Sequence, residues 1–169
     1  MENNIKLLVL SDSHGRTGKL KNIIMDNPGA DAIIFLGDGE DDFDDATTAC
    51  GMNKYATVQK AVILQVRGNC DRMSMEQVTI LHEFAGIKFY ITHGFEQGVK
   101  YGLEEIATNA YYSECKVALF GHTHRQHLSE TSGITLFNPG AVANGEYGLI
   151  NISDGEMTFE HKVYRMYIV

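Results

Sequence analysis

Five short apolar segments constrain what this chain can fold into. They are rich in Val, Ile, Leu and Phe, and they cover residues 5–10, 32–36, 61–66, 87–92 and 117–120. Short apolar runs of this kind with Gly close by predict buried β-strands. Helical spacing of apolar residues predicts helices over 17–26 and 98–111. An acidic start followed by apolar and small residues suits a helix over 40–51. Further strands are expected at 78–82, 134–137, 148–152 and 157–163.

Each of the five segments is followed by side chains that bind metal ions. In chain order these are Asp12 and His14, Asp38, Asn69, His93, and His122 with His124. Ligands of open sheets collect outside the carboxyl ends of the strands. If the five strands lie side by side, their ends bring two carboxylates, four imidazoles and an amide into one cleft. A donor set of this size indicates two metal ions.

Taken singly, most of these motifs also have ordinary structural interpretations. Asp12 or Ser13 suits a helix N-cap, Asp38 between two glycines suits a turn, and His93 suits a hydrogen-bonded histidine. The His-Thr-His motif at 122–124 is stronger, because alternate residues of an extended loop point to opposite sides and can serve two metals.

Three other histidines are not predicted to be ligands. His122, His124 and His127 have an HxHxxH spacing like that of metallo-β-lactamases. That family has Asp before the third histidine and carries the loop near its start, so we reject the match and expect His127 to be exposed. His82 and His161 fall inside predicted strands and are expected to be structural or surface residues.

Composition limits the class of protein. A chain of 169 residues fits one domain, taken as 1–169, and its formal charge of −8 disfavours stable nucleic-acid or anionic-membrane partners. No apolar run approaches 18 residues, and no secretory signal is recognised. Three widely spaced cysteines indicate reduced thiols and a cytoplasmic protein. The acidic run 40–45 is expected to be a solvated helix start.

Taken in order, the five blocks resemble the calcineurin-like metallophosphoesterases. The blocks are Asp12-Ser13-His14, Gly37-Asp38, Gly68-Asn69-Cys70-Asp71, His93-Gly94 and Gly121-His122-Thr123-His124. The short chain and the Gly-Asn-Cys-Asp form are similar to the small bacterial and archaeal phosphodiesterase branch, to which the retromer scaffold subunit is related. The resemblance extends to a turn at 138–140. It implies an α/β fold, a four-layer α/β/β/α sandwich of two mixed sheets flanked by helices.

The resemblance also implies a dinuclear metal centre. Asp12, His14 and His124 would hold one ion, Asn69, His93 and His122 the other, and Asp38 would bridge them. Mn²⁺ is the expected metal, and Zn²⁺, Fe²⁺ and Ni²⁺ are compatible with the same donors. A hydroxide activated by two metals would attack the phosphorus atom. Asn69 would also contact a phosphoryl oxygen, and Asp71 would orient a neighbouring ligand.

One departure from the family concerns the proton donor. Many larger members have histidine where Cys70 stands, and a thiol is a poor substitute for protonating a leaving group. Arg67, Arg72 and Arg125 flank the motifs and are candidates for substrate phosphate, with surface ion pairing as the alternative.

We therefore predict a metal-dependent phosphodiesterase that acts on a small phosphoester. The alternatives are a phosphomonoesterase or pyrophosphatase, and a non-catalytic protein-binding scaffold of the same fold. The sequence does not set the oligomeric state, and a homo-oligomer is compatible with it.

Overall fold

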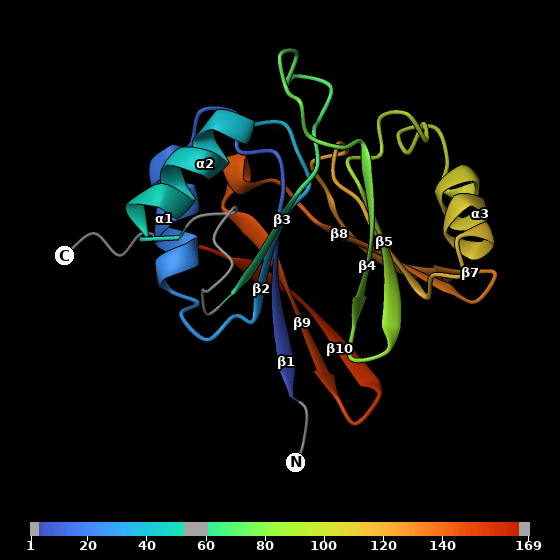
Figure 1. Ribbon diagram of the computed structural model, residues 1–169. Helices are drawn as coiled ribbons and strands as arrows, with labels where there is room; N and C mark the ends of the chain where they lie inside the picture. Colours follow the sequence, from blue (N-terminus) through green and yellow to red (C-terminus); the bar gives the residue numbers. More distant parts are fainter. Residues whose placement is uncertain (1–3, 53–60, 166–169) are drawn as a thin grey trace.

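The computed structural model describes residues 4–52 and 61–165, which form two five-stranded sheets and three α-helices (Figure 1). The first sheet has the order β10-β9-β1-β2-β3, with β1, β2 and β3 parallel and β9 and β10 antiparallel. Its strands are β1 (Ile5–Leu10), β2 (Ala32–Phe35), β3 (Val62–Gln65), β9 (Glu146–Ser153) and β10 (Glu156–Val163).

The second sheet has the order β4-β5-β6-β8-β7. Its three central strands are parallel, and its two edge strands are antiparallel to their neighbours. The strands are β4 (Thr79–Phe84), β5 (Ile87–Thr92), β6 (Val117–Leu119), β7 (Gln126–Thr131) and β8 (Ile134–Pro139).

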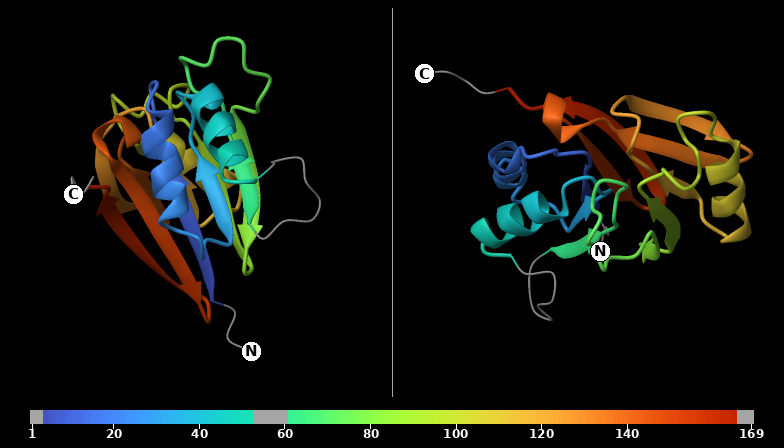
Figure 2. Two further views of the ribbon diagram at one scale, coloured as in Figure 1. Left: turned by 90° about the vertical axis from the view of Figure 1, so that its left-hand side faces the viewer. Right: turned by 90° about the horizontal axis from the view of Figure 1, so that it is seen from above.

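The helices cover the outer faces of the two sheets. Seen from above, α1 (Thr17–Met25) and α2 (Glu40–Ala49) lie beyond the first sheet, and α3 (Glu104–Tyr112) lies beyond the second (Figure 2). A short 3₁₀ helix, η1 (Val142–Asn144), precedes β9. Between the sheets, fully buried side chains such as Val9, Phe89 and Phe137 form one core. The predicted four-layer α/β/β/α sandwich of mixed sheets is therefore confirmed.

The arrangement of the five motif-bearing strands differs from the sequence prediction. They do not lie side by side in one sheet: β1, β2 and β3 belong to the first sheet, whereas β5 and β6 belong to the second. Because the two sheets pack face to face, their carboxyl ends still meet at one end of the sandwich, the upper end in Figure 1. The candidate site is therefore built across the junction of two sheets.

Two further differences have local causes. The helix expected from residue 98 begins only at Glu104, because residues 94–101 form turns in which Val99 N–H donates to Gly94 and Tyr101 N–H donates to Gly98. Strand β7 was not predicted, since Leu128 is its only aliphatic residue and it lies at a sheet edge. The turn expected at 138–140 is partly strand, because β8 continues to Pro139. In the described residues, no helix is long and apolar enough to cross a membrane.

Two aspartates fasten the loops at the carboxyl end of the first sheet. Asp71, in the loop after β3, accepts backbone hydrogen bonds from Gly68 and Asp38 at 2.7 and 2.8 Å, and from Gly39 and Glu40 at 2.9 and 3.0 Å. Its carboxylate therefore joins the β3–β4 loop to the start of α2.

The second aspartate that holds loops together is Asp42, in the first turn of α2. It accepts hydrogen bonds from the hydroxyls of Ser13 and Thr17 at 2.6 and 2.7 Å, and from Gly15 N–H at 2.7 Å. The acidic start of α2 was expected to be solvated, but Asp42 is half-buried and holds the β1–α1 loop. Burial opposes its ionisation, yet these hydrogen bonds outweigh that effect and lower the pKa of Asp42.

We predict that Asp71→Asn lowers the free energy of unfolding by about 1.5–3 kcal/mol, the range for hydrogen bonds to charged groups. The amide nitrogen of asparagine would face backbone N–H groups and could not accept from them. Chemical denaturation of the variant measures the loss. The control is Asp45→Asn, an exposed carboxylate on α2. Equal stability of the two variants would contradict the structural role of Asp71.

Candidate metal centre

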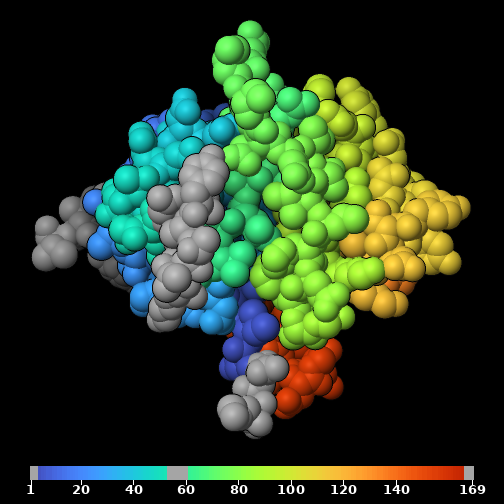
Figure 3. Space-filling view, viewed as in Figure 1, coloured from blue at the N-terminus to red at the C-terminus, as the bar shows by residue number. Residues whose placement is uncertain are grey.

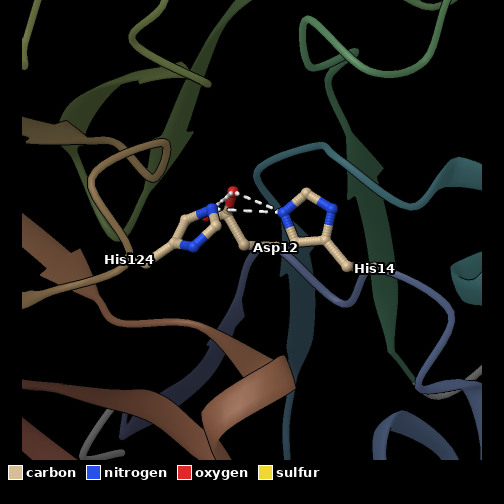
Figure 4. A group of neighbouring side chains, drawn as sticks. All are labelled: Asp12, His14 and His124. Atoms are coloured by element: carbon tan, nitrogen blue, oxygen red, sulfur yellow. Dashed lines mark hydrogen bonds and ion pairs between the residues drawn. The ribbon is translucent and has the colours of Figure 1, made fainter.

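Three predicted ligands of the first metal lie together at the ends of β1 and β6. The Nε2 atoms of His124 and His14 lie 3.1 and 3.7 Å from Oδ1 of Asp12. The same two Nε2 atoms lie 3.1 Å from each other, and all three side chains point to one spot (Figure 4). The loops after strands of two different sheets thus supply one carboxylate and two imidazoles.

A second set gathers around His93 at the end of β5. Its Nε2 atom lies 3.1 Å from Oδ1 of Asn69 and 3.2 Å from Nδ1 of His122. Oδ2 of Asp38 lies 3.4 Å from the same nitrogen. This set combines an amide oxygen, two imidazoles and a carboxylate.

Asp38 connects the two sets. Its Oδ2 atom lies 3.4 Å from Nε2 of His93 in the second set and 3.9 Å from Nε2 of His14 in the first. Its Oδ1 atom accepts the backbone N–H of Cys70 at 2.7 Å. All seven predicted ligand side chains therefore lie in one cluster, and their role as ligands stays a prediction.

The atoms of this cluster fit metal ions. Nδ1 of His93 donates to the carbonyl of Leu36 at 2.7 Å, so in a neutral ring Nε2 carries a lone pair. That lone pair faces the oxygens of Asn69 and Asp38, an arrangement that requires a second proton or a cation. Oδ1 of Asp12 is buried without a hydrogen-bond donor. A histidine that donates its other N–H to a carbonyl is typical of metal ligands.

Backbone strain is concentrated at the same residues. Asp12, His14, Asp38, His122 and His124 have positive φ angles of 56°, 43°, 60°, 64° and 57°. A non-glycine residue in this region costs on the order of 1–3 kcal/mol and persists where the surroundings enforce it. The other described non-glycine cases, Ala85, Glu114, Ser132 and Asp154, lie in turns or after a helix. Such concentration is typical of functional sites.

Two glycines allow the loops to approach closely enough. A Cβ atom at Gly68 would collide with Oδ1 and the backbone nitrogen of Asp38. A Cβ atom at Gly121 would collide with the hydroxyl of Ser11 and Oδ2 of Asp12. Glycine at these positions therefore lets the ends of two strands pack directly against the buried carboxylates.

A second layer of polar residues orients the ligands. Oδ2 of Asp12 accepts the hydroxyl of Ser11 at 2.6 Å and the N–H of His122 at 3.0 Å. The buried Asn138 donates to the carbonyl of Gly121 at 2.8 Å and to the hydroxyl of Thr123 at 3.1 Å. The sequence analysis did not predict a role at the site for Ser11 or Asn138. For Asn138 the one sequence signal was the turn expected at 138–140.

The surroundings of Asp38 and His122 set the protonation states of these two residues. Burial opposes ionisation of Asp38, but the hydrogen bond and charge of His93 outweigh it and keep the pKa of Asp38 well below its usual range. Burial, with the charges of His93 and Lys100, lowers the pKa of His122 to about 4. At neutral pH Asp38 is therefore a carboxylate and His122 a neutral imidazole.

The remaining predicted residues have varied positions. Both Asp71 oxygens accept backbone N–H groups, including that of Asp38, so this carboxylate positions the loop of a ligand. Cys70 is exposed, and its sulfur lies within 4.8 Å of ligand atoms of His14 and Asp38. The sequence did not indicate this third group of donors. Arg67 lies 4.0 Å from Glu96.

The other three histidines are placed as follows. His127 was expected to be exposed, but it is half-buried, because its ring packs near Phe120 and its Nε2 atom lies 2.7 Å from the Ser129 hydroxyl. His161 stacks on Phe137, and His82 contacts Phe84. Both lie in strands as predicted.

A cleft of about 340 Å³ adjoins the second set of ligands. It lies between the β3–β4 loop and the loop after β5, and it is lined by Asn69, His93, Arg67, Arg72 and Phe95 among others. Figure 3 shows the β3–β4 loop, in green, projecting beyond the rest of the surface at the top. The exposed ring of Phe95 meets the ring of His122 edge to face at 5.3 Å. The cleft can therefore hold part of a molecule whose reacting group lies at the ligands.

Known proteins are similar to this chain in sequence and in fold. A probable metallophosphoesterase of Mycoplasma pneumoniae is 30% identical over 141 residues, 81% of this chain and 79% of its own. A phosphodiesterase of Methanocaldococcus jannaschii is 25% identical over 177 residues, 95% of this chain and 97% of its own. The crystal structure of a predicted phosphoesterase from Streptococcus pneumoniae has a TM-score of 0.74 at 20% identity, with 95% of this chain and 90% of that chain covered.

The family assignment rests on most of the chain. Residues 5–154 match the model of the calcineurin-like phosphoesterase superfamily domain. This range includes all five motifs and every residue of the cluster described above. The chain belongs to the calcineurin-like phosphoesterase superfamily.

Proposed function

We propose that the protein hydrolyses phosphodiesters at a centre of two divalent metal ions. The observation that carries the proposal is the position of Asp38, whose Oδ2 atom lies 3.9 Å from His14 of one ligand set and 3.4 Å from His93 of the other. A carboxylate shared by two sets suits a pair of ions. The similarity to a phosphodiesterase of M. jannaschii supports the choice of diesters.

The donors suit Mn²⁺, which accepts a mixture of carboxylate, amide and imidazole ligands. One ion would be held by Asp12, His14 and His124, and the second by Asn69, His93 and His122. Asp38 would bind both ions. When bound, such ions polarise phosphoryl oxygens and make a water molecule more acidic. Zn²⁺, Fe²⁺ and Ni²⁺ are compatible with the same ligands.

The residues of the chain bind and orient the ester. The amide nitrogen of Asn69 is a hydrogen-bond donor for a phosphoryl oxygen, because its side chain is exposed at the cleft and its oxygen faces His93. Asp71 keeps the loop of Asn69 against the loop of Asp38. In hydrolysis the oxygen of water bonds to phosphorus, one P–O ester bond breaks, and a phosphomonoester and an alcohol leave.

Cys70 is a weak candidate for protonating the departing alcohol. Burial and the nearby carboxylate of Asp38 raise the pKa of its thiol to about 11. The thiol is therefore neutral at pH 7 and gives up its proton reluctantly. Substrates with good leaving groups should be favoured.

We further propose that the protein acts in the cytoplasm. All three cysteines are free thiols, the state that a reducing compartment maintains. The substrate is proposed to be a small phosphoester, with no stable nucleic-acid or membrane partner.

The first prediction from the proposed function concerns metal dependence. Chelation should reduce hydrolysis of bis(4-nitrophenyl) phosphate to the background rate, and added Mn²⁺ should restore it, because without the ions no Lewis acid polarises the phosphoryl oxygens or makes the water more acidic. Initial rates with a panel of divalent ions, accompanied by metal analysis, measure the effect. Full activity in metal-free protein would refute the proposal. A preference for 4-nitrophenyl phosphate would favour a phosphomonoesterase, and binding of metal without hydrolysis would favour a scaffold.

The second prediction concerns the shared carboxylate. Asp38→Ala should lose both ions, because neither set then has its common oxygen ligand, whereas His14→Ala should mainly weaken one. Metal content after dialysis against Mn²⁺ distinguishes the two variants, with Asp45→Ala as the exposed control. Two fully occupied ions in Asp38→Ala would show that Asp38 is not the bridge.

The third prediction concerns Cys70. Cys70→Ala should change kcat/KM by less than about tenfold for diesters with low-pKa leaving groups, since general acids typically contribute about 10²–10⁴-fold only where the departing oxygen needs a proton. The measurement is kcat/KM across leaving groups of rising pKa. A loss that grows with leaving-group pKa would mean that the thiol does assist departure.

A further inference from the structure

A second pocket, of about 520 Å³, adjoins the loop that carries His122 and His124. It is formed between the loop after β5 and the turn between β6 and β7. Its apolar wall consists of Val99, Leu103 and Phe120, and its polar groups include Lys100 and Arg125. The function proposed above does not use this pocket.

The pocket is cationic in an acidic protein. No Asp or Glu is among its lining residues, although the whole chain has a formal charge of −8. Lys100 and Arg125 are both exposed, and neither forms an ion pair with a carboxylate in the described part of the chain. Two cations without acidic partners, beside an apolar wall, suit an anionic group attached to an apolar or ring-shaped body.

The pocket is adjacent to the metal ligands. Thr123, which lines it, stands between His122 and His124, and Arg125 directly follows His124. Lys100 and Thr123 line the same pocket, so the ammonium group lies beside the loop that carries His122 and His124. The hydroxyl of Thr123 is held by Asn138, which fixes this side of the pocket. A substituent of an ester bound at the centre can therefore reach it.

The cleft beside Asn69 and His93 has a different charge balance. Arg67 and Arg72 line it together with Asp71 and Glu96, and Arg67 lies 4.0 Å from Glu96. That cleft is therefore less selective for an anion. One ester arm of a diester could therefore lie in the mixed-charge cleft, and the other in the cationic pocket of Lys100 and Arg125.

We propose that the pocket of Lys100 and Arg125 binds a second anionic group of the substrate. This inference rests on the proposed function and narrows its substrate class: the preferred phosphodiesters carry a carboxylate or phosphate on one ester arm. Lys100 and Arg125 are specificity-determining residues, because they contact the remote anion and not the reacting phosphorus.

A matched pair of substrates tests the proposal. 4-Nitrophenyl phenyl phosphate and 4-nitrophenyl 4-carboxyphenyl phosphate have the same leaving group and differ in one carboxylate. The carboxylated ester should have a kcat/KM about 5–20-fold higher, mainly through KM, because two exposed charge pairs each typically contribute up to about fivefold. Lys100→Met and Arg125→Met should each reduce this preference, and the double variant should bring the ratio close to one.

Lys116→Met is the matched control. Lys116 is exposed and immediately precedes β6, at the opposite end of that strand from the metal ligands. This variant should retain the full preference. The preference should also decline as ionic strength rises, since exposed charges are screened by salt.

The outcomes separate this inference from the proposed function. Hydrolysis of both esters at equal rates would overturn the anion pocket and leave the phosphodiesterase intact. Hydrolysis of neither would overturn the phosphodiesterase. In that case binding of terephthalate to chelator-treated protein, followed by NMR, decides the pocket alone: the wild type and Lys116→Met should bind it, and the double variant should bind at least about fivefold more weakly. Equal binding by all three would refute the inference.

Discussion

The carboxylate of Asp38, buried at the junction of two sheets, is the constraint on which the rest of the site depends. A charge in this position is costly unless hydrogen bonds and opposite charge compensate it. The compensation comes from both sheets: Cys70 N–H from the loop after β3, and His93 from the end of β5. The carbonyl of Leu36 in turn fixes His93. The same contacts therefore hold the sheets together and position the predicted ligands.

The contacts that compensate the Asp38 carboxylate require strained backbone conformations in the surrounding loops. Five of the predicted ligand residues have left-handed backbones, and Gly68 and Gly121 stand where any side chain would collide with a buried aspartate. Loops left to themselves would relax away from such conformations. Asp71 and Asp42 prevent this: the Asp71 carboxylate accepts hydrogen bonds from Asp38 before α2 and Gly68 after β3, and the Asp42 carboxylate accepts them from the β1–α1 loop. Part of the stability of the fold is thus used to keep the ligands converged.

The sequence predicted the ligand cluster because its signals are local. An apolar run followed by Asp, His or Asn identifies a strand end, as at Val9 and Leu10 before Asp12. The distribution of those strands over two sheets, the edge strand β7 and the late start of α3 depend on packing that no local pattern records. Asp42, Asn138 and Lys100 were missed for the same reason: each acts on a segment far away in sequence or across a loop.

The charge distribution explains how an acidic chain can receive an anionic ester. With a formal charge of −8, the molecule as a whole repels phosphate, so attraction has to be local. Divalent ions at the buried aspartates would reverse the sign of the field at the centre. Lys100 and Arg125 extend a positive region to one side, while Asp41 and Asp42 line an acidic pocket with Cys70 on another. Under the proposed function, this distribution would favour one orientation of a diester, with its more anionic arm toward Lys100 and Arg125.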